Sequence, residues 1–414
     1  MPSPAIYADL TVPAAGSTTG REVLSHAVRR LVGDLSRILR QPTADPLLRA
    51  DLAGLARAFA AMPDRAGALS AVLRRANVAV LVRCARDGDP ALVPELVATL
   101  AVELAVLGAL PAPVELRCLP PRLVSLAGRF ALDLPAGATL VASSREIRVR
   151  ALTFDPRDPR GVERPFVPVV GDVVLALADQ NPLSMLEAHP NKAGNRIDLG
   201  GRSADEWCAS LREALARIER HLPELRAEFD LHVQQLVPVG YDPEAHLSAS
   251  YREAIGTIYL TLHPQPMTMT EALIHEFSHG KLNALFEVDE VLRNDPAAVY
   301  KSPVRPDPRP LHGVLLAAHA FVPVARLYEA MLAASDPLAA HPSFAQRFAQ
   351  IVASNHEGIS LLLAHADPTP AGRALLDELA RWDAHYSASS AVIAARTPAV
   401  SPGPESEGAG RSSA

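Results

Sequence analysis

The segment from Gly256 to Phe286 constrains the fold of this chain more than any other. Its first nine residues, GTIYLTLHP, alternate aliphatic side chains with Thr and Tyr, which is the pattern of a half-buried strand. The stretch TMTEALIHEFSHGKLNALF then repeats apolar residues at helical spacing, and Thr268 with Glu271 forms a capping-box pattern that predicts where the helix begins. The sequence therefore predicts a strand that runs directly into a helix carrying HEFSH.

His275 and His279 are four residues apart in this helix, so both imidazoles lie on one face and can bind a single divalent ion. The same five letters also arise by chance, with an ordinary core histidine beside an exposed glutamate. A helix that follows an alternating strand favours the functional interpretation. We predict that His275 and His279 are metal ligands and that Glu276 is the catalytic residue of the motif.

Two histidines do not complete a metal site, so a third ligand must come from elsewhere. The position of the third histidine of a metzincin is taken by Leu285, which excludes that arrangement. In RPLHGVLLAAHAFVPVARLYEAM, His312 and His319 share one face of an apolar helix, and Pro323 lacks the N–H that would bond the His319 carbonyl, so the helix is expected to kink or open there. We favour His319 over His312. The acidic candidates are Glu287, Asp289, Glu290 and Glu329.

Just upstream, SPVRPDPRPLHG places Arg305 and Arg309 among prolines, which hold the backbone extended. Two guanidinium groups on a stiff loop suit bidentate capture of a carboxylate. The alternative is a surface loop whose arginines pair with Asp307 or with solvent.

Taken together, HPNKAGN, SASYREAIGTIYLTLHP, EALIHEFSHGKLNAL and SPVRPDPRPLHGVLLAAHAF resemble the HEXXH-motif peptide-modification proteins found with ribosomally made peptide natural products. The resemblance covers about residues 181–334. It implies an Fe(II)- and α-ketoglutarate-dependent hydroxylase that oxidises a side chain of a precursor peptide, which would be its partner.

By the same resemblance, His275 and His279 match the two motif ligands. Arg305 and Arg309 match a PWR-x-DPRP-like segment, in which an arginine holds the cosubstrate. Related sequences often read LLHGAYAF, which places the later histidine where this chain has Leu316. The nearby downstream histidine here is His319, one helical turn further on. The ligand has therefore shifted by a turn, or this chain uses His312 or lacks the ligand.

Three functions remain open from the residues. In the hydroxylase, three protein ligands leave positions for the keto acid and O₂, and Glu276 orients a ligand or a bound water. In a zinc peptidase, Glu276 is the general base and the strand at 256–264 aligns a peptide by edge pairing. In a peptide-binding protein, the metal site is structural or vestigial, which an open coordination position would argue against.

The rest of the chain indicates a helix-rich α+β protein. Its 414 residues are 49% hydrophobic, enough for two or three packed units. We expect an N-terminal helical bundle at 1–110, a small β-rich region at 111–180, the metal-binding domain at 181–335, C-terminal helices at 336–397 and a disordered tail at 398–414. In the metal-binding domain the motif helix is expected to pack near a small sheet in a zincin-like manner.

Charge and cysteine content narrow the partners and the compartment. The formal net charge is -6 with both signs mixed along the chain, which disfavours nucleic acid. The start of the chain lacks a signal peptide, and Glu95 and Glu103 interrupt the most apolar run, so we expect a cytoplasmic protein without a membrane partner. The three cysteines, Cys84, Cys118 and Cys208, are irregularly spaced and are expected to be reduced thiols.

Overall fold

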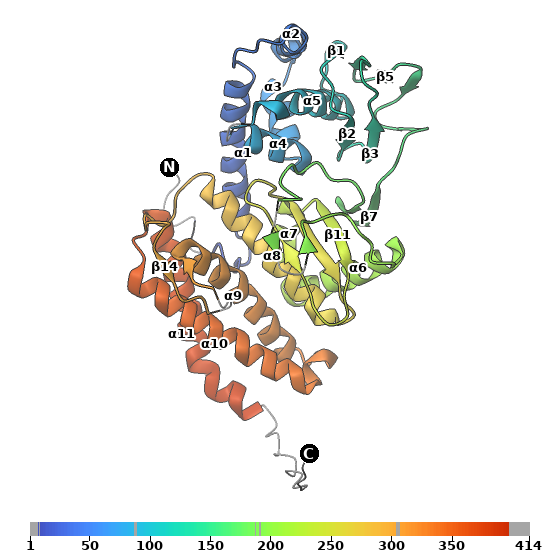
Figure 1. Ribbon diagram of the computed structural model, residues 1–414. Helices are drawn as coiled ribbons and strands as arrows, with labels where there is room; N and C mark the ends of the chain where they lie inside the picture. The colour runs from blue at the N-terminus through green and yellow to red at the C-terminus, as the bar shows by residue number, and fades with distance from the viewer. Residues whose placement is uncertain are drawn as a thin grey trace, which may run out of the picture.

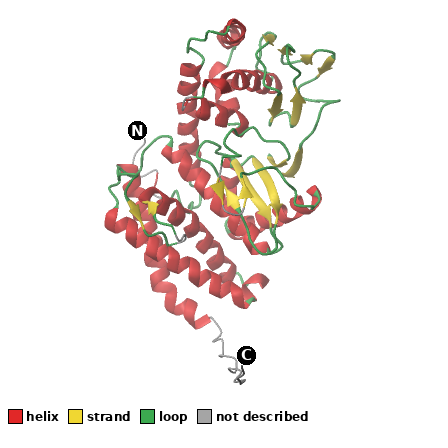
Figure 2. Cartoon of the chain, viewed as in Figure 1, coloured by secondary structure: helices red, strands yellow, loops and turns green. Residues whose placement is uncertain are grey.

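The computed structural model describes residues 7, 9–86, 89–186, 188–189, 192–303 and 307–396 (Figure 1). The predicted tail at 398–414 lies outside these residues. The chain is about 53% helical and 15% strand, with the strands in small sheets, so the predicted α+β, helix-rich class is confirmed (Figure 2).

Five helices form the N-terminal part of the fold. They are α1 (Thr19–Ile38), α2 (Pro46–Ala61), α3 (Arg65–Leu73), α4 (Ala76–Arg86) and α5 (Val93–Leu107). Asp45 accepts backbone N–H groups at the start of α2, and α5 ends at Gly108, whose φ of 76° favours glycine. The helices surround a buried aliphatic core that includes Leu81 and Leu100.

Two small antiparallel sheets cover this helical core. One has the order β1 (Val114–Leu116), β4 (Leu140–Ala142), β5 (Ile147–Val149), β6 (Leu152–Phe154), and the other pairs β2 (Arg122–Ser125) with β3 (Phe130–Asp133). Leu116, Phe130 and Ile147 are buried in the same hydrophobic cluster as the helices. The strands between residues 114 and 154 therefore complete the N-terminal core rather than forming a separate one.

The central sheet has the order β12-β13-β11-β8-β7. Its strands are β7 (Phe166–Val170), β8 (Val173–Ala176), β11 (Gln235–Tyr241), β12 (Ser248–Ala249) and β13 (Thr257–Leu262). β11 is parallel to β8 and β13, whereas β7 and β12 are antiparallel edge strands. The sheet that supports the motif helix thus includes strands on both sides of the predicted boundary at residue 180.

All six residues of β13 are buried, so the expectation of a half-buried strand is wrong. Ile258 and Leu260 belong to the cluster beneath the helices, and Tyr259 belongs to a second cluster on the opposite face. Layers on both faces bury the whole strand. Because β13 pairs with β11 and β12, neither of its edges is open along the paired residues, and the edge pairing proposed for 256–264 has no free strand edge there.

The motif helix is α8 (Pro266–Phe286), which packs against α1, α9 and α6 (Ala204–His221), with α7 (Pro223–His232) nearby. The predicted helix is therefore present, but the capping box is wrong. The helix begins at Pro266, whose fixed φ suits a first turn, so Thr268 lies inside the helix. Glu271 instead accepts hydrogen bonds from Tyr328 and Arg347.

Three long helices complete the chain: α9 (Leu311–Ala333), α10 (Pro342–His365) and α11 (Pro370–Arg396). A short pair, β14 (Val299–Tyr300) with β15 (Arg309–Pro310), precedes α9. The contacts of Phe286 with His312 and of Glu271 with Tyr328 show that α8 and α9 run antiparallel. α9 is continuous through Pro323, so the expected opening of the helix is not observed.

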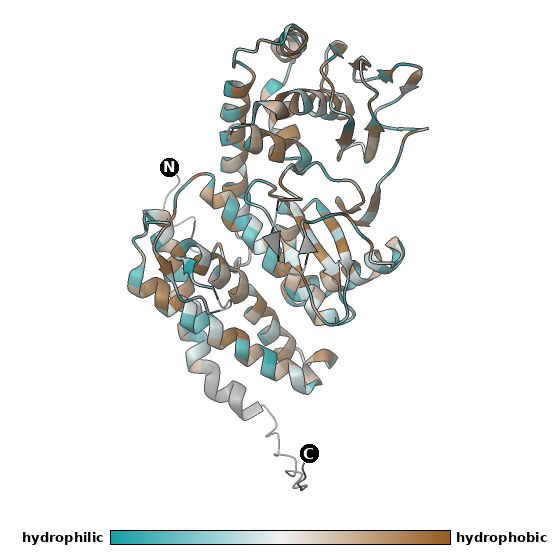
Figure 3. Cartoon of the chain, in the orientation of Figure 1, coloured by the Kyte–Doolittle hydropathy of each residue, from teal (hydrophilic) through white to brown (hydrophobic). Residues whose placement is uncertain are grey.

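Two helical stretches, Pro90–Leu107 and Leu311–Ala333, are long and apolar enough to cross a membrane by length and composition alone. Within this fold, 61% of the most apolar stretch of the first helix and 72% of that of the second are buried. Figure 3 shows apolar residues along α9, which packs between α8 and α10. Packing in the protein interior therefore accounts for much of their apolar character.

Candidate active site

His275 and His279 converge, as the motif predicts. Their Nε2 atoms are 2.8 Å apart and their ring centroids 4.3 Å apart. Two imidazole nitrogens bound to one metal at about 2.0–2.1 Å are about 3.0–3.4 Å apart, so only a small adjustment would fit this pair around an ion. The buried His275 Nδ1 has no hydrogen-bond partner among the described residues. The pair therefore fits a metal through its Nε2 atoms.

The protonation state of this pair also suits metal binding. Burial lowers the pKa of His275 well below its ordinary value, and the neighbouring His279 lowers it further. Burial likewise lowers the pKa of His279, while Glu276 opposes that change. Both imidazoles are neutral at pH 7 as a result, and the neutral ring is the form that binds a metal ion.

Glu276 is 5% exposed and connects α8 to the edge strand β12. The Ser248 hydroxyl donates to one carboxylate oxygen at 2.7 Å, and the Ser250 hydroxyl donates to the other at 2.7 Å. Both oxygens are thus engaged by serines on either side of Ala249. The sequence signal for this contact was the SAS triplet, which we did not single out.

His319, the favoured third ligand, lies on α9 with 0% exposure. Burial lowers its pKa well below the ordinary value, with further contributions from Lys281 and His279. Backbone hydrogen bonding with Leu10 and Ser278 acts in the opposite direction, so the ring contacts backbone groups of both residues. Across that part of the chain, no three His, Cys, Asp or Glu side chains are grouped to hold a metal ion. The structure therefore does not bring His319 together with His275 and His279 as a ligand set.

The other third-ligand candidates fall into two groups. Glu287 and Glu329 are engaged in ion pairs with arginines, which gives each of them a structural role. Asp289, Glu290 and His312 instead line a cleft that reaches His279. These three are the candidates that share an open space with the motif.

This cleft has a volume of about 840 Å³ and contains His279 in its wall. Leu316 lines it together with Ser250 and Asn283. The N-terminal bundle contributes Arg30 from α1. The N-terminal helices carry no recognisable motif, so the contribution of Arg30 to the cleft could not be predicted from the sequence.

Of the two arginines predicted to bind the cosubstrate, the structure describes only Arg309. Arg305 lies outside the described residues. Arg309 lies in β15, and its Nε is 2.6 Å from an oxygen of Asp307, with both side chains partly exposed. Arg309 is not among the described residues that line the cleft. The ion pair with Asp307 is the arrangement expected for a surface loop whose arginines pair with Asp307 rather than with a ligand.

Lys281 is fully buried on α8 and forms an ion pair with Glu228 of α7, with 2.7 Å between Nζ and Oε2. Glu228 also accepts the backbone N–H of Gly20 at 3.2 Å. His232 approaches the Gly20 carbonyl at 3.1 Å, and burial lowers its pKa to about 3, so this ring is neutral. These contacts join α8 to α7 and to the start of α1.

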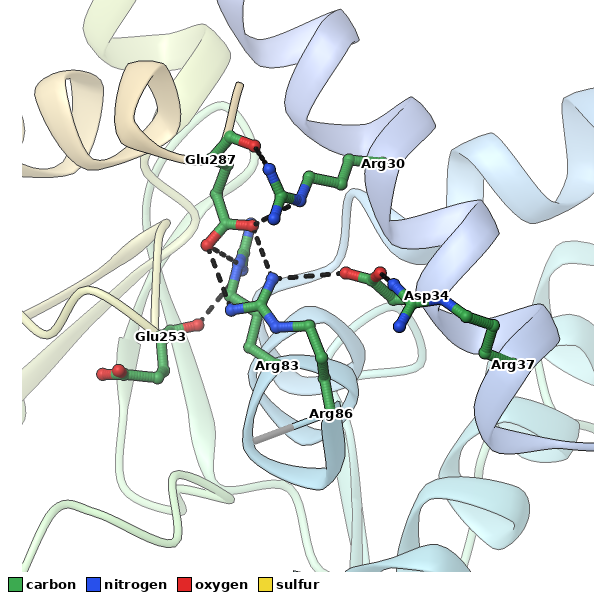
Figure 4. A network of polar contacts seen from close by, with 7 residues as sticks. All are labelled: Arg30, Asp34, Arg37, Arg83, Arg86, Glu253 and Glu287. Atoms are coloured by element: carbon green, nitrogen blue, oxygen red, sulfur yellow. Dashed lines mark hydrogen bonds and ion pairs between the residues drawn. The ribbon is translucent and has the colours of Figure 1, made fainter. Parts of the chain in front are cut away.

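A second polar network surrounds Glu287 at the C-terminal end of α8 (Figure 4). Glu287 is 2% exposed and lies 2.7 Å from Arg86 and 3.7 Å from Arg83, both of α4. Arg30 of α1 donates to the Glu287 carbonyl at 2.5 Å. These arginines hold the pKa of the Glu287 carboxyl below its usual value despite its burial. The network fixes the N-terminal helices to the motif helix.

The three cysteines, Cys84, Cys118 and Cys208, form no disulfide, as expected. Burial, together with Asp45, raises the pKa of the Cys118 thiol to about 11, so this thiol is protonated at neutral pH. The motif histidines remain the site with the clearest potential for chemistry.

Comparison with known proteins finds no matching family model and no similar curated protein. The geometry of the site and the resemblance carried by its motifs are therefore the basis for assigning a function.

Proposed function

We propose that this protein is an Fe(II)/α-ketoglutarate-dependent hydroxylase that acts on a side chain of a ribosomally synthesised precursor peptide. One combination of contacts supports this most. The Nε2 atoms of His275 and His279 converge at 2.8 Å, whereas both carboxylate oxygens of Glu276 accept serine hydroxyls. The motif therefore offers two neutral metal ligands and a glutamate that is already hydrogen-bonded through both oxygens.

This arrangement favours the hydroxylase over the zinc peptidase. A peptidase of this type needs the motif glutamate as a general base, with a carboxylate oxygen directed at the metal-bound water. In this structure each of those oxygens instead accepts a serine hydroxyl, from Ser248 or Ser250. Glu276 thus serves better to hold α8 against β12 and to keep the two histidines in place.

The open cleft at His279 disfavours a purely structural metal site, since structural sites have a closed set of ligands. Its volume of about 840 Å³ falls within the usual range of ligand-binding sites, roughly 300–1,000 Å³. A side chain of a bound peptide would approach His279 through this cleft. Leu316 keeps part of the wall apolar, which helps to exclude water from the reacting group.

When bound, iron with α-ketoglutarate and O₂ supplies the oxidation of a substrate C–H bond. His275 and His279 would hold the metal, and Arg309, or Arg305, would bind the far carboxylate of the cosubstrate. Arg309 already pairs with a carboxylate, Asp307, and would exchange it for that of the ligand. His319 stays the third ligand proposed from the sequence, although the structure does not group it with His275 and His279, and His312 in the cleft wall is the alternative.

The test is anaerobic loading with Fe(II) or Zn(II), followed by an assay for O₂- and α-ketoglutarate-dependent succinate formation with the cognate peptide. We expect succinate and a hydroxylated peptide from the iron form only. Zinc-dependent cleavage of the peptide without succinate would instead establish the peptidase.

A Glu276→Gln variant sharpens this test. A hydroxylase should keep activity within about 10-fold, because the amide still connects α8 with β12 through one hydroxyl. A peptidase should lose at least about 100-fold, because the general base is gone. Metal content of the variant, measured by elemental analysis, controls for a damaged site.

A further inference from the structure

Arg252 lies just after β12 and lines the cleft together with His279 and Ser250. Its side chain is exposed, and it makes no ion pair or hydrogen bond within the described residues. Arg293, in the same wall, differs because it pairs with Glu290 at 3.6 Å and with Asp367 at 3.7 Å. Arg252 is therefore a cation in the cleft with its hydrogen-bonding capacity free.

The backbone on both sides of Arg252 is fixed. Ser250, two residues before it, donates to Glu276 on the motif helix. On the other side, Arg83 donates to the carbonyl of Glu253 at 3.1 Å (Figure 4). Arg83 is itself 2% exposed and held near Glu287, so this anchor is rigid. Arg252 therefore keeps its place beside the motif while its guanidinium group can respond to a ligand.

The surrounding charges favour an anionic ligand at this end of the cleft. Arg30, whose side chain is 52% exposed, adds a second positive charge to the wall. Three acids also line the cleft, and each is already engaged: Glu290 pairs with Arg293, Asp289 accepts the Thr369 hydroxyl and the Val291 N–H, and Asp295 accepts the Ala297 N–H. A guanidinium group binds a carboxylate through two parallel hydrogen bonds, which provides both affinity and orientation.

We propose that Arg252, with Arg30 in the lining of the same cleft, is a carboxylate-binding residue of the cleft. This inference builds on the proposed function, because it names what the substrate cleft recognises. Two ligands carry the required group: an acidic side chain of the precursor peptide and α-ketoglutarate. In either case the carboxylate is held next to His279.

The experiment measures binding rather than turnover, so it is independent of succinate formation. Titration calorimetry with the zinc-supplied full chain compares two probes, α-ketoglutarate and the peptide N-acetyl-Ala-Asp-Ala-amide, with the Asn peptide as a matched ligand. The variants are Arg252→Gln and Arg252→Lys. The control is Arg57→Gln, an exposed arginine on α2 that lines a different cavity.

We expect Arg252→Gln to weaken binding of one probe by about 10-fold or more, as for loss of a charge-assisted hydrogen bond. Arg252→Lys should lose less, and Arg57→Gln should stay within about 2-fold of wild type. A loss confined to the Asp peptide identifies the substrate as the source, and a loss confined to α-ketoglutarate identifies the cosubstrate. Equal binding of both probes by wild type and Arg252→Gln, or no binding of either by wild type, overturns the proposal.

Discussion

The motif helix α8 carries two sets of buried polar groups that differ in how they are satisfied. Lys281 and Glu287 each have an oppositely charged partner within 2.7 Å, and Glu276 has a hydroxyl on each oxygen. By contrast, the His275 Nδ1 has no hydrogen-bond partner among the described residues.

This difference distinguishes residues that stabilise the fold from residues that are available to bind a ligand. Buried polar groups are normally paired, because each one left unsatisfied costs about 1–3 kcal/mol. The His275 ring, with an unpaired Nδ1, contacts His279 of the cleft wall, so the two histidines are candidates for binding a ligand. The paired groups should matter for folding, and the motif histidines should matter for chemistry.

Lys281→Met should have the largest effect, because it leaves the Glu228 carboxylate buried without its cation. We expect a loss of about 3–5 kcal/mol in the free energy of unfolding, measured by urea denaturation. The double variant Lys281→Met/Glu228→Leu should recover part of that loss, since it removes the uncompensated charge. Recovery stays incomplete because the Gly20 N–H loses its acceptor. A single variant as stable as wild type contradicts the structural role of the pair.

Glu287→Gln should cost about 3 kcal/mol, because Arg83 and Arg86 lose their shared carboxylate. The pKa of Glu287 is lowered in the folded state, so its contribution is complete above the unfolded value of about 4.3 and is lost as the pH falls through the folded pKa. The difference in stability between wild type and variant should thus be large at pH 7 and shrink below about pH 4. A difference that does not change with pH contradicts the ionic interpretation.

His275→Ala and His279→Ala test the opposite expectation, a loss of metal binding with little loss of stability. Each variant should lose metal affinity by more than about 100-fold, measured by competition with a chromophoric chelator. The unfolding free energy of the metal-free protein should change much less than in Lys281→Met. Either substitution removes only the contact between the two Nε2 atoms, because the His275 Nδ1 has no partner to lose. His341→Ala, at the start of α10, is a matched histidine control that should leave metal affinity unchanged. Comparable destabilisation in the motif variants and in Lys281→Met would remove the distinction.

The smallest effect is expected for Ser250→Ala, which removes one of the two hydroxyls from Glu276. A hydrogen bond to a charged group contributes about 1.5–3 kcal/mol, and a water molecule can partly replace this one because Ser250 is only half-buried. We expect about 1 kcal/mol, measured by thermal unfolding. The double variant with Ser248→Ala should lose more than the sum of the single variants if no water replaces either hydroxyl.

Local sequence patterns predicted the local structure well. The strand at β13, the helix at α8 and the convergence of His275 with His279 all follow from residue periodicity over about 30 residues. The start of α8 was predicted incorrectly because Pro266 fixes the first turn before Thr268 is reached.

Contacts between distant segments were beyond the reach of periodicity. No pattern linked Arg30 or Arg83 to Glu287, which is about 200 residues or more away in the sequence. The burial of both faces of β13 likewise depends on layers contributed by other segments. The identity of the third ligand likewise depends on a contact between distant segments. Helix periodicity places His319 and His312 on one face but does not determine which of them approaches α8.

The position of Arg30 in the cleft has a consequence for protein engineering. A fragment limited to residues 181–335 would retain the HEFSH helix yet lose Arg30 from the cleft, the two strands β7 and β8 of the central sheet, and the arginines that neutralise Glu287. Such a fragment would expose the apolar surface of α8 that α1 covers. The unit to clone, transplant or recombine therefore starts before α1.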